Sequence, residues 1–244
     1  MDQAVARALG ILEAVASSPG PLRLTRIAEA VGLSKSTAHR QLQTLVDLGY
    51  VVREPDTNRY GASLKLWELG SAVVGEHPVK RAATPFLHEL HRQCGHTVSL
   101  LLPVGDEVLY LDKIISPRSA HFRTRPGSRA PAPFTSGGRA MLAYDPDARE
   151  RVERVAEQVK ARRVLDIDAF MADLPRVRTR GYAINLLNPE VVSIGCALLA
   201  RDGKAAAALS VSSSSETMDE AEQGRVADAL LATCSRLAEL VGRL

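Results

Sequence analysis

Polar side chains gather on one side of the segment KSTAHRQLQTLVDL, residues 35–48. Apolar residues recur in this segment at helical spacing, at Ala38, Leu42, Leu45 and Val46. This period predicts an amphipathic helix that packs through its apolar side. The opposite side carries hydroxyl, guanidinium and amide groups, on Ser36, Arg40, Gln43 and Thr44. Such groups hydrogen-bond base edges and phosphates, and an α-helix fits the major groove, so this face predicts contact with DNA.

The segments around this helix predict a winged helix-turn-helix. Residues 3–16 indicate a first helix with one apolar stripe, formed by Val5, Leu9, Leu12 and Ala16. After the breaker SSPGP, LTRIAEAV at 24–31 predicts a short second helix. Gly32 then supplies a left-handed turn, Leu33 enters the core, and Ser34 caps the third helix. The sequences YVVRE, PDTN and RYGAS follow as a strand, a turn and a strand.

We expect the DNA contacts to come from the third helix and from the wing. The candidates are Ser34, Lys35, Ser36, Thr37, His39, Arg40, Gln43, Thr44 and Arg59. Backbone N–H groups at the start of the helix also favour a phosphate. An alternative is a winged-helix sensor that acts through protein contacts, in which this face is simply solvated. The turn, the cap and the wing occur in the order of a DNA-binding module, which favours DNA.

The chain after residue 63 predicts a linker helix and then an α+β domain. LKLWELGSAVVGEH is the linker, and an amphipathic helix follows at 79–94. Two hairpins are expected, turning at Gly105–Asp106 and at Asp202–Gly203. Further helices are expected at 137–144, 146–160, 168–180 and 219–242. The predicted domains are therefore 1–62 for DNA binding, 63–76 for the linker and 77–244 for a sensor-like domain.

Composition places the chain among globular proteins. It has 244 residues, 45% hydrophobic and 24% charged, which is enough to build a core. The net charge is +3, so any basic surface depends on placement. No signal peptide or membrane-length segment is evident, and we expect a cytoplasmic protein with no membrane partner. Cys94, Cys196 and Cys234 lie far apart, which predicts reduced, mostly buried thiols.

A metal site and an enzyme are two alternatives to DNA binding. His88, His91, Cys94 and His96 have spacings that suit zinc. On a helix, however, Cys94 falls on the apolar side and His88 and His91 on the other, so we expect surface histidines and no metal site. A small-molecule hydrolase is the second alternative, but GxSxG, HExxH and Walker motifs are absent from the sequence. We expect no catalytic residue and no cofactor.

Several separated motifs resemble one family of regulators. RALGILEAV, LTRIAEAVGLSKSTAHRQLQTLVDLGYV and RYGASLKLWELG resemble the DNA-binding domain of IclR-family transcriptional regulators. GSRAPAPFTSGGRAMLAY, RVRTRGYAIN and DGKAAAALSVS resemble that family's effector-binding domain. The resemblance implies a GAF-like C-terminal α/β domain that binds a small metabolite. It also implies homodimers joined through the DNA-binding domains, often paired into tetramers, and so a palindromic double-stranded DNA operator.

The resemblance also implies a set of effector-binding residues. Carried over by position, they are Ser136, Gly137, Gly138, Asn185, Gly195, Ser210 and Ser212. Three positions differ from the family pattern. Asn185 replaces a common acidic residue, Gly195 replaces a frequent cysteine, and Pro133 replaces the usual histidine. These changes predict a more neutral and roomier pocket, which suits a small carboxylic acid or a related amide or hydrazide.

Arginines are concentrated between residues 114 and 144, a stretch without Asp or Glu. They are Arg118, Arg123, Arg125, Arg129 and Arg139. Either they favour an anionic ligand near the TSGGRA motif, or they are solvated or paired across a subunit interface.

The function expected from all these features is a ligand-responsive repressor of a catabolic operon. The preference for a repressor over an activator follows only from the family resemblance. The apolar sides of helix 3–16 and of LKLWELG, with Trp67, are the surfaces expected at the dimer contact.

Overall fold

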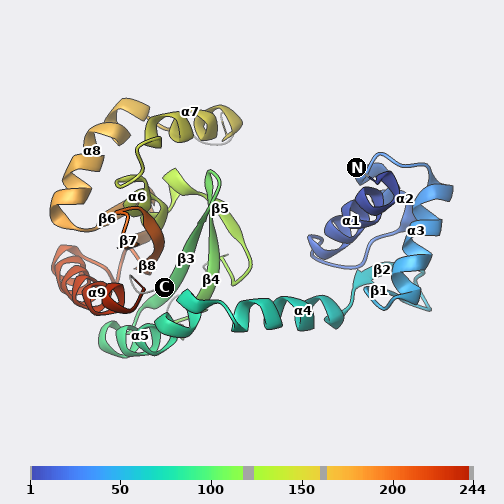
Figure 1. Ribbon diagram of the computed structural model, residues 1–244, viewed down its shortest axis with the longest axis horizontal. Helices are drawn as coiled ribbons and strands as arrows, with labels where there is room; N and C mark the ends of the chain where they lie inside the picture. The colour runs from blue at the N-terminus through green and yellow to red at the C-terminus, as the bar shows by residue number, and fades with distance from the viewer. Residues whose placement is uncertain (1, 118–123, 160–163, 242–244) are drawn as a thin grey trace. The chain divides into compact units, whose positions relative to one another are not determined.

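The computed structural model describes residues 2–117, 124–159 and 164–241. The chain divides into two compact units, Met1–Gly75 and Glu76–Leu244 (Figure 1). Each unit has its own hydrophobic core.

The N-terminal unit is a winged helix-turn-helix followed by one further helix. Its elements are α1 (Gln3–Ala16), α2 (Leu24–Ala30), α3 (Lys35–Asp47), β1 (Val51–Arg53), β2 (Tyr60–Ala62) and α4 (Leu64–Gly75). The two strands pair antiparallel and form the wing. Residues of all three first helices and both strands share one core: Ile11, Val15, Ile27, Ala28, Ala38, Leu42, Leu45, Val51 and Tyr60. The predicted fold of this unit is confirmed.

Local chemistry explains the turn between α2 and α3. Gly32 adopts φ +66°, a conformation that L side chains rarely take. The Leu33 N–H then donates to the Ala28 carbonyl at 2.9 Å, and the Leu33 side chain packs against the core. Ser34 Oγ accepts a hydrogen bond from the Thr37 N–H at 3.2 Å and so caps α3, as expected.

Helix α1 packs through a different side from the predicted stripe. Ile11 and Val15 are buried, whereas the side chains of Val5 and Leu9 are 55% and 53% exposed. The helix carries apolar residues on two sides, and periodicity alone does not show which of them faces the core. Val5 and Leu9 of the predicted stripe therefore do not face the core of this unit, and both remain available for contact with another surface.

Helix α4 is joined to the winged helix through its first turn. Lys65 Nζ donates to the Leu48 carbonyl at 2.8 Å and lies 4.4 Å from the centroid of the Tyr50 ring. None of the residues of α4, all of which the structure describes, is buried. Trp67 is 70% exposed. Much of the apolar surface of this helix is therefore uncovered within one chain.

The C-terminal unit is built on a six-stranded sheet of order β5-β4-β3-β8-β7-β6, in which all neighbours are antiparallel. The strands are β3 (Thr97–Val104), β4 (Glu107–Ile114), β5 (Arg129–Pro131), β6 (Ala183–Asn188), β7 (Val191–Leu199) and β8 (Ala205–Ser214). The β3–β4 and β7–β8 hairpins turn where predicted. The three-residue β5, which ends in a proline, was not predicted because it shows no strand pattern of its own.

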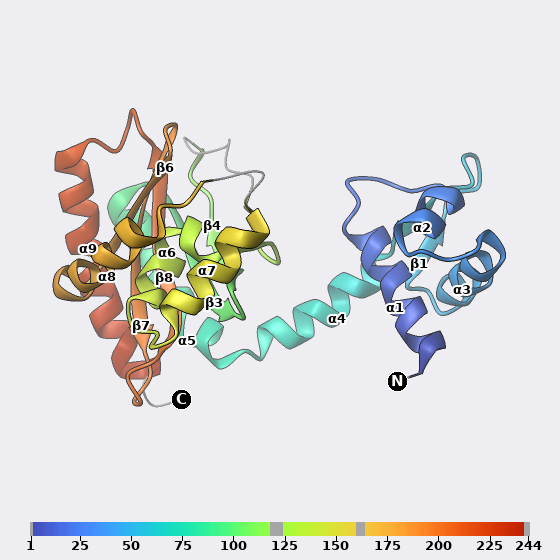
Figure 2. The same ribbon diagram turned by 90° about the horizontal axis from the view of Figure 1, so that it is seen from above.

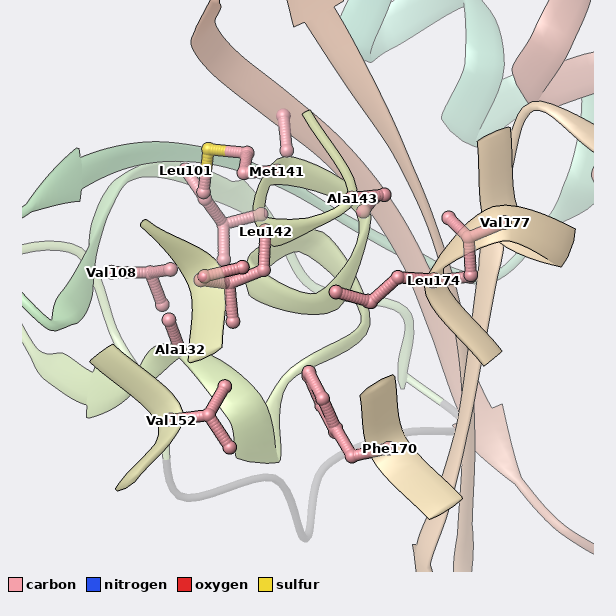
Figure 3. Packing of buried hydrophobic residues seen from close by; sticks show 14 residues of the cluster. Leu101, Val108, Ala132, Met141, Leu142, Ala143, Val152, Phe170, Leu174 and Val177 are labelled. Atoms are coloured by element: carbon pink, nitrogen blue, oxygen red, sulfur yellow. The ribbon is translucent and has the colours of Figure 1, made fainter. Parts of the chain in front are cut away.

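Helices cover both faces of this sheet. α5 (Pro78–Cys94) and α9 (Glu220–Val241) lie side by side along one face (Figure 2). The other face carries the short 3₁₀ helix η2 (Ala132–Phe134), α6 (Ser136–Leu142), α7 (Ala148–Val159) and α8 (Ile167–Arg180). Figure 3 shows the core on that side, where Leu142, Phe170 and Leu174 of the helices belong to one cluster with Leu101 and Val108 of the sheet. The predicted mixed α+β fold is confirmed.

The histidine-rich end of α5 is a structural cluster that joins α5, β3 and α9. His96 is buried, and its Nε2 lies 2.7 Å from Glu222 Oε1 on α9. Arg225 donates to the same carboxylate through Nε at 2.8 Å and to the Gln93 carbonyl through Nη1 at 3.2 Å. His91 Nδ1 lies 2.7 Å from the His96 carbonyl. The expectation of surface histidines is therefore wrong for His96, because its partner comes from a distant helix.

This cluster leads to a prediction for acid stability. Arg225 first, and then His96, lower the pKa of the Glu222 carboxyl from 4.5 to about 2. The ionised form therefore stabilises the fold at pH values above about 4.5, and the contribution is lost as the pH falls toward 2. We expect Glu222→Gln to lower the free energy of unfolding at neutral pH by about 1–2 kcal/mol, an amount reduced by partial solvent screening. Denaturant melts at neutral and at acid pH measure it.

The control for this prediction is Glu220→Gln, an exposed neighbour in the same first turn of α9. It removes the same charge near the helix start without breaking the cluster. The difference between Glu222→Gln and wild type should shrink as the pH is lowered. Equal losses in the two variants, or a difference that does not depend on pH, would show that the cluster has no special role.

Candidate DNA-binding and effector sites

The exposed face of α3 presents most of the predicted DNA-binding side chains. Ala38, Leu42 and Leu45 are buried beneath the helix. Six candidates on the other sides are exposed: Lys35, Ser36, His39, Arg40, Gln43 and Thr44. The burial pattern thus separates a packing side from a polar side, as the sequence predicted.

Hydrogen bonds divide these candidates into two groups. Ser34 and Thr37 are joined by a 2.9 Å hydroxyl bond within the cap, and Thr44 donates to the Arg40 carbonyl. Gln43 Nε2 donates to Asp47 Oδ1 at 2.8 Å. Within the described residues, the side chains of Lys35, His39 and Arg40 have no such partner. The second group can therefore bind DNA without breaking an existing bond, whereas Gln43 must first leave Asp47.

The wing contributes a further exposed cation. Arg59 is exposed next to the turn of the β1–β2 hairpin. Arg53, which sequence reasoning did not select, donates to Asn58 Oδ1 at 2.8 Å and lies 5.8 Å from the centroid of the Tyr60 ring. Arg53 is therefore occupied in holding the wing together, and Arg59 is better placed to reach a phosphate.

The predicted effector residues come together on one face of the six-stranded sheet. Strand register places Ser210 of β8 opposite Gly195 of β7, and Ser212 opposite Ser193. Asn185 of β6 also lies opposite Ser193. Directly opposed residues of antiparallel strands point to the same side of a sheet. This side faces α6, because Ala208 and Ala183 on it belong to the core formed with α6.

The start of α6 lies directly on this face, and glycines allow the close approach. An ideal Cβ on Gly195 would stand 2.4 Å from the Ser136 carbonyl carbon and 2.5 Å from the Gly137 nitrogen. A Cβ on Gly138 would meet the Ala132 carbonyl oxygen at 2.2 Å. The expectation that Gly195 makes the pocket roomier is therefore wrong. The backbone at the start of α6 occupies the space that a side chain at this position would fill.

Asn185 is also partly committed to holding this region. Its Nδ2 donates to the Phe134 carbonyl at 2.8 Å, and its Oδ1 accepts from the Leu187 N–H at 3.3 Å. The side chain is half-buried, and Ser212 is half-buried nearby on the same face. Asn185 thus fixes the segment before α6 in addition to any contact with a ligand.

The arginine-rich stretch does not form one cationic pocket in the described residues. Arg129 lies 3.7 Å from Glu107, and Arg139 lies 3.5 Å from Asp173 of α8. The Arg139 guanidinium also stacks 4.5 Å from the centroid of the Phe170 ring. Arg125 is exposed, and Arg118 and Arg123 lie outside the described residues. Arg139 is therefore engaged with α8 of the same chain.

Comparison with known proteins decides the family. The IclR helix-turn-helix domain matches residues 4–55, and the C-terminal domain of bacterial IclR transcriptional regulators matches residues 71–239. The protein belongs to the IclR family. It is therefore a DNA-binding transcriptional regulator, as the sequence motifs predicted.

Individual relatives of this IclR-family protein agree in sequence and in fold. It is 32% identical over 225 residues to the HTH-type transcriptional regulator XynR of Escherichia coli, covering 90% of this chain and 89% of XynR. It is 30% identical over 243 residues to BhcR of Paracoccus denitrificans, covering 96% and 86%. The crystal structure of Thermotoga maritima IclR superposes with a TM-score of 0.77 at 25% identity, covering 98% of each chain.

A second solved structure shows the same fold at lower identity. An IclR regulator of Alicyclobacillus acidocaldarius superposes with a TM-score of 0.83 at 24% identity, covering 99% of this chain and 100% of that one. No helix within the described residues of this IclR-family regulator is long and apolar enough to cross a membrane.

Proposed function

We propose that this regulator represses a catabolic operon and is controlled by a small carboxylic acid or a related amide or hydrazide. One observation supports a ligand-controlled regulator most directly: the same chain carries two polar surfaces of different kinds. The N-terminal unit exposes the polar face of α3, and in the C-terminal unit α6 covers a sheet face that carries hydroxyl and amide groups. The preference for a repressor rests on the family.

The proposed DNA contacts are those of α3 and the wing: Ser34, Lys35, Ser36, Thr37, His39, Arg40, Gln43, Thr44 and Arg59. Lys35 and Arg59 suit phosphates, since both are exposed cations, the first at the start of α3 and the second in the wing. One winged helix covers a single half-site, so a stable complex needs two copies on a palindromic operator.

The proposed dimer contact uses apolar surface that is uncovered in one chain. Val5 and Leu9 of α1 and Leu64 and Trp67 of α4 are all exposed. Large apolar side chains that remain exposed on two helices of one unit favour a protein–protein contact. We propose that it joins two DNA-binding units, and that dimers pair into tetramers through the other units. A monomer by light scattering at micromolar concentration, with and without DNA, would contradict this assembly.

The proposed effector site combines Ser136, Gly137, Gly138, Asn185, Gly195, Ser210 and Ser212. We expect Ser210→Ala and Asn185→Ala to weaken effector binding by about 1–3 kcal/mol each, because a buried polar group of the ligand loses its partner. Asn185→Ala should also lower stability, since the Phe134 carbonyl loses its donor. Calorimetric titration measures the effector affinity of each variant. The ligands are the acids and amides that the neighbouring genes suggest.

Ser213→Ala is the matched control, because Ser213 lies on the same strand but on the opposite face, where it bonds Thr217. It should keep the wild-type affinity. The same acids are then added to the protein bound to DNA from beside its own gene, at several salt concentrations. An effector that changes DNA binding but binds Ser210→Ala and Asn185→Ala as tightly as wild type would place the pocket elsewhere.

A further inference from the structure

A cavity of about 300 Å³ lies at the end of the six-stranded sheet where the β3–β4 and β7–β8 hairpins turn. Gly105 and Asp106 of the first turn and Lys204 of the second turn line it. Met141 and Leu142, at the end of α6, line it from the helical side. A volume of this size is at the lower end of the range for small-molecule sites.

This cavity is separate from the proposed effector site. Ala205 lines the cavity and Ser210 belongs to the effector set, and the two are about 17 Å apart along β8. The effector set also uses the start of α6, whereas Met141 and Leu142 lie at its end. Of the proposed effector residues, Gly138 alone lines the cavity. A ligand in the cavity would therefore be a second ligand of this domain.

The inner wall of the cavity is apolar. Val108, Ala132, Met141 and Leu142 line it, and all four are buried members of the core shown in Figure 3. Sites for small molecules commonly combine such a wall with a few polar groups that fix the orientation of the ligand. The wall suits an aliphatic group.

Ion pairs at the edge of the cavity satisfy two of its carboxylates and one of its cations. Arg151 Nη1 donates to the Gly105 carbonyl at 2.8 Å and lies 3.3 Å from Asp106 Oδ1. The Nε of Arg151 lies 2.7 Å from Asp145 Oδ2. Arg154 donates to both oxygens of Asp106 at 3.0 Å. These contacts join the β3–β4 turn to α7 and leave Asp106, Asp145 and Arg151 with partners inside the protein.

Two opposite charges remain at the edge. Glu107, which also lines the cavity, lies 3.7 Å from Arg129. The side chains of Asp147 and Lys204 are exposed, and neither has a hydrogen bond or an ion pair among the residues that the structure describes. They do not pair with each other either, so a molecule that carries both charges can bridge them. The edge of the cavity thus offers one free anion and one free cation.

We propose that this cavity binds an α-amino acid with an aliphatic side chain, whose carboxylate pairs with Lys204 and whose ammonium pairs with Asp147. The aliphatic side chain lies against Val108 and Leu142. A ligand with a single charge gains only one charge-assisted contact, whereas a zwitterion gains both. The site goes beyond the proposed function, since neither the DNA contacts nor the effector pocket depends on it.

Three probes of similar shape test this proposal. L-leucine carries both charges, isocaproate lacks the ammonium, and isoamylamine lacks the carboxylate. Full-length protein is titrated with each at millimolar concentration, and backbone NMR shifts are followed at Leu142 and Lys204 and, in the effector set, at Ser210 and Ser212. Leucine should give saturable shifts at the first pair and not at the second. The other two probes should bind the cavity about threefold more weakly or worse, as expected for loss of one exposed ion pair.

Two charge variants then assign the two ends of the ligand. Lys204→Met should weaken leucine and isocaproate by similar factors and leave isoamylamine unchanged. Asp147→Asn should weaken leucine and isoamylamine and leave isocaproate unchanged. Lys204→Arg should keep the wild-type affinities. A change in structure alone would affect all three probes together, so this crossed pattern is specific to the proposed pairing.

Glu216→Gln is the matched control, because Glu216 is an exposed carboxylate of the same unit that does not line the cavity. It should bind leucine as wild type does. The absence of a saturable response of Leu142 and Lys204 to leucine would overturn the site. Equal affinities for the three probes, or wild-type leucine affinity in both Lys204→Met and Asp147→Asn, would likewise overturn it.

Discussion

Gly195→Ala is expected to destabilise the C-terminal unit by about 3 kcal/mol, the upper part of the range for overpacked cores. The added methyl group would stand 2.4 Å from the Ser136 carbonyl carbon and 2.6 Å from its oxygen. These are backbone atoms, so no side-chain rotation relieves the clash, and α6 must move away from the sheet. For a unit of this size the melting temperature should fall by about 6–12 °C.

Calorimetry of Gly195→Ala and of a matched glycine variant checks this result. Gly224 lies inside α9, and a Cβ there would meet no atom within 4 Å. Gly224→Ala should therefore stabilise the protein by up to about 1 kcal/mol, through helix propensity alone. If Gly195→Ala melts at the wild-type temperature, α6 does not rest on Gly195 in solution and the region has the space that the sequence first suggested.

The double variant Arg40→Ala, Gln43→Ala is expected to lose at least about 100-fold in affinity for its specific operator. Each bidentate base contact contributes about 1–3 kcal/mol of discrimination. Arg40 should account for the larger part, because Gln43 must give up its 2.8 Å bond to Asp47 before it can bind a base. Fluorescence anisotropy with the operator and with a random duplex separates specific from general binding.

Lys35→Ala provides the comparison for this measurement. As a proposed phosphate contact, it should weaken binding to the operator and to random DNA to a similar extent, and it should flatten the dependence of affinity on salt. Arg92→Ala is the control for the loss of one positive charge, because Arg92 is exposed in the other unit. Normal operator binding by the double variant would remove α3 from base recognition.

The sequence by itself determined the features whose causes lie within a few residues of each other. The left-handed Gly32, the Ser34 cap and the apolar side of α3 all depend on neighbouring residues, and all were predicted at the right positions. The hairpin turns near Gly105 and Gly203 are local in the same sense, because glycine permits the positive φ observed at both. The family, and with it DNA binding, followed from motifs that are read directly along the chain.

The tertiary structure alone decided how distant segments meet. Helix α1 has two apolar sides, and packing selected Ile11 and Val15 for the core. In the sequence, Gly195 indicates a space where a side chain would otherwise stand. In the structure the backbone of α6 occupies that space, because a glycine leaves room only where no other atoms approach. His96 gained its partner Glu222 from a helix more than 120 residues away in sequence.

The same reason applies to the face of the sheet below α6. Asn185, Gly195 and Ser210 lie on three different strands, and nothing in the spacing along the chain shows that they share a face. Only the register of β6, β7 and β8 aligns them, and register is set by hydrogen bonds between strands. Spacing along a sequence describes one element at a time, whereas a binding site is formed by several elements that pack against each other.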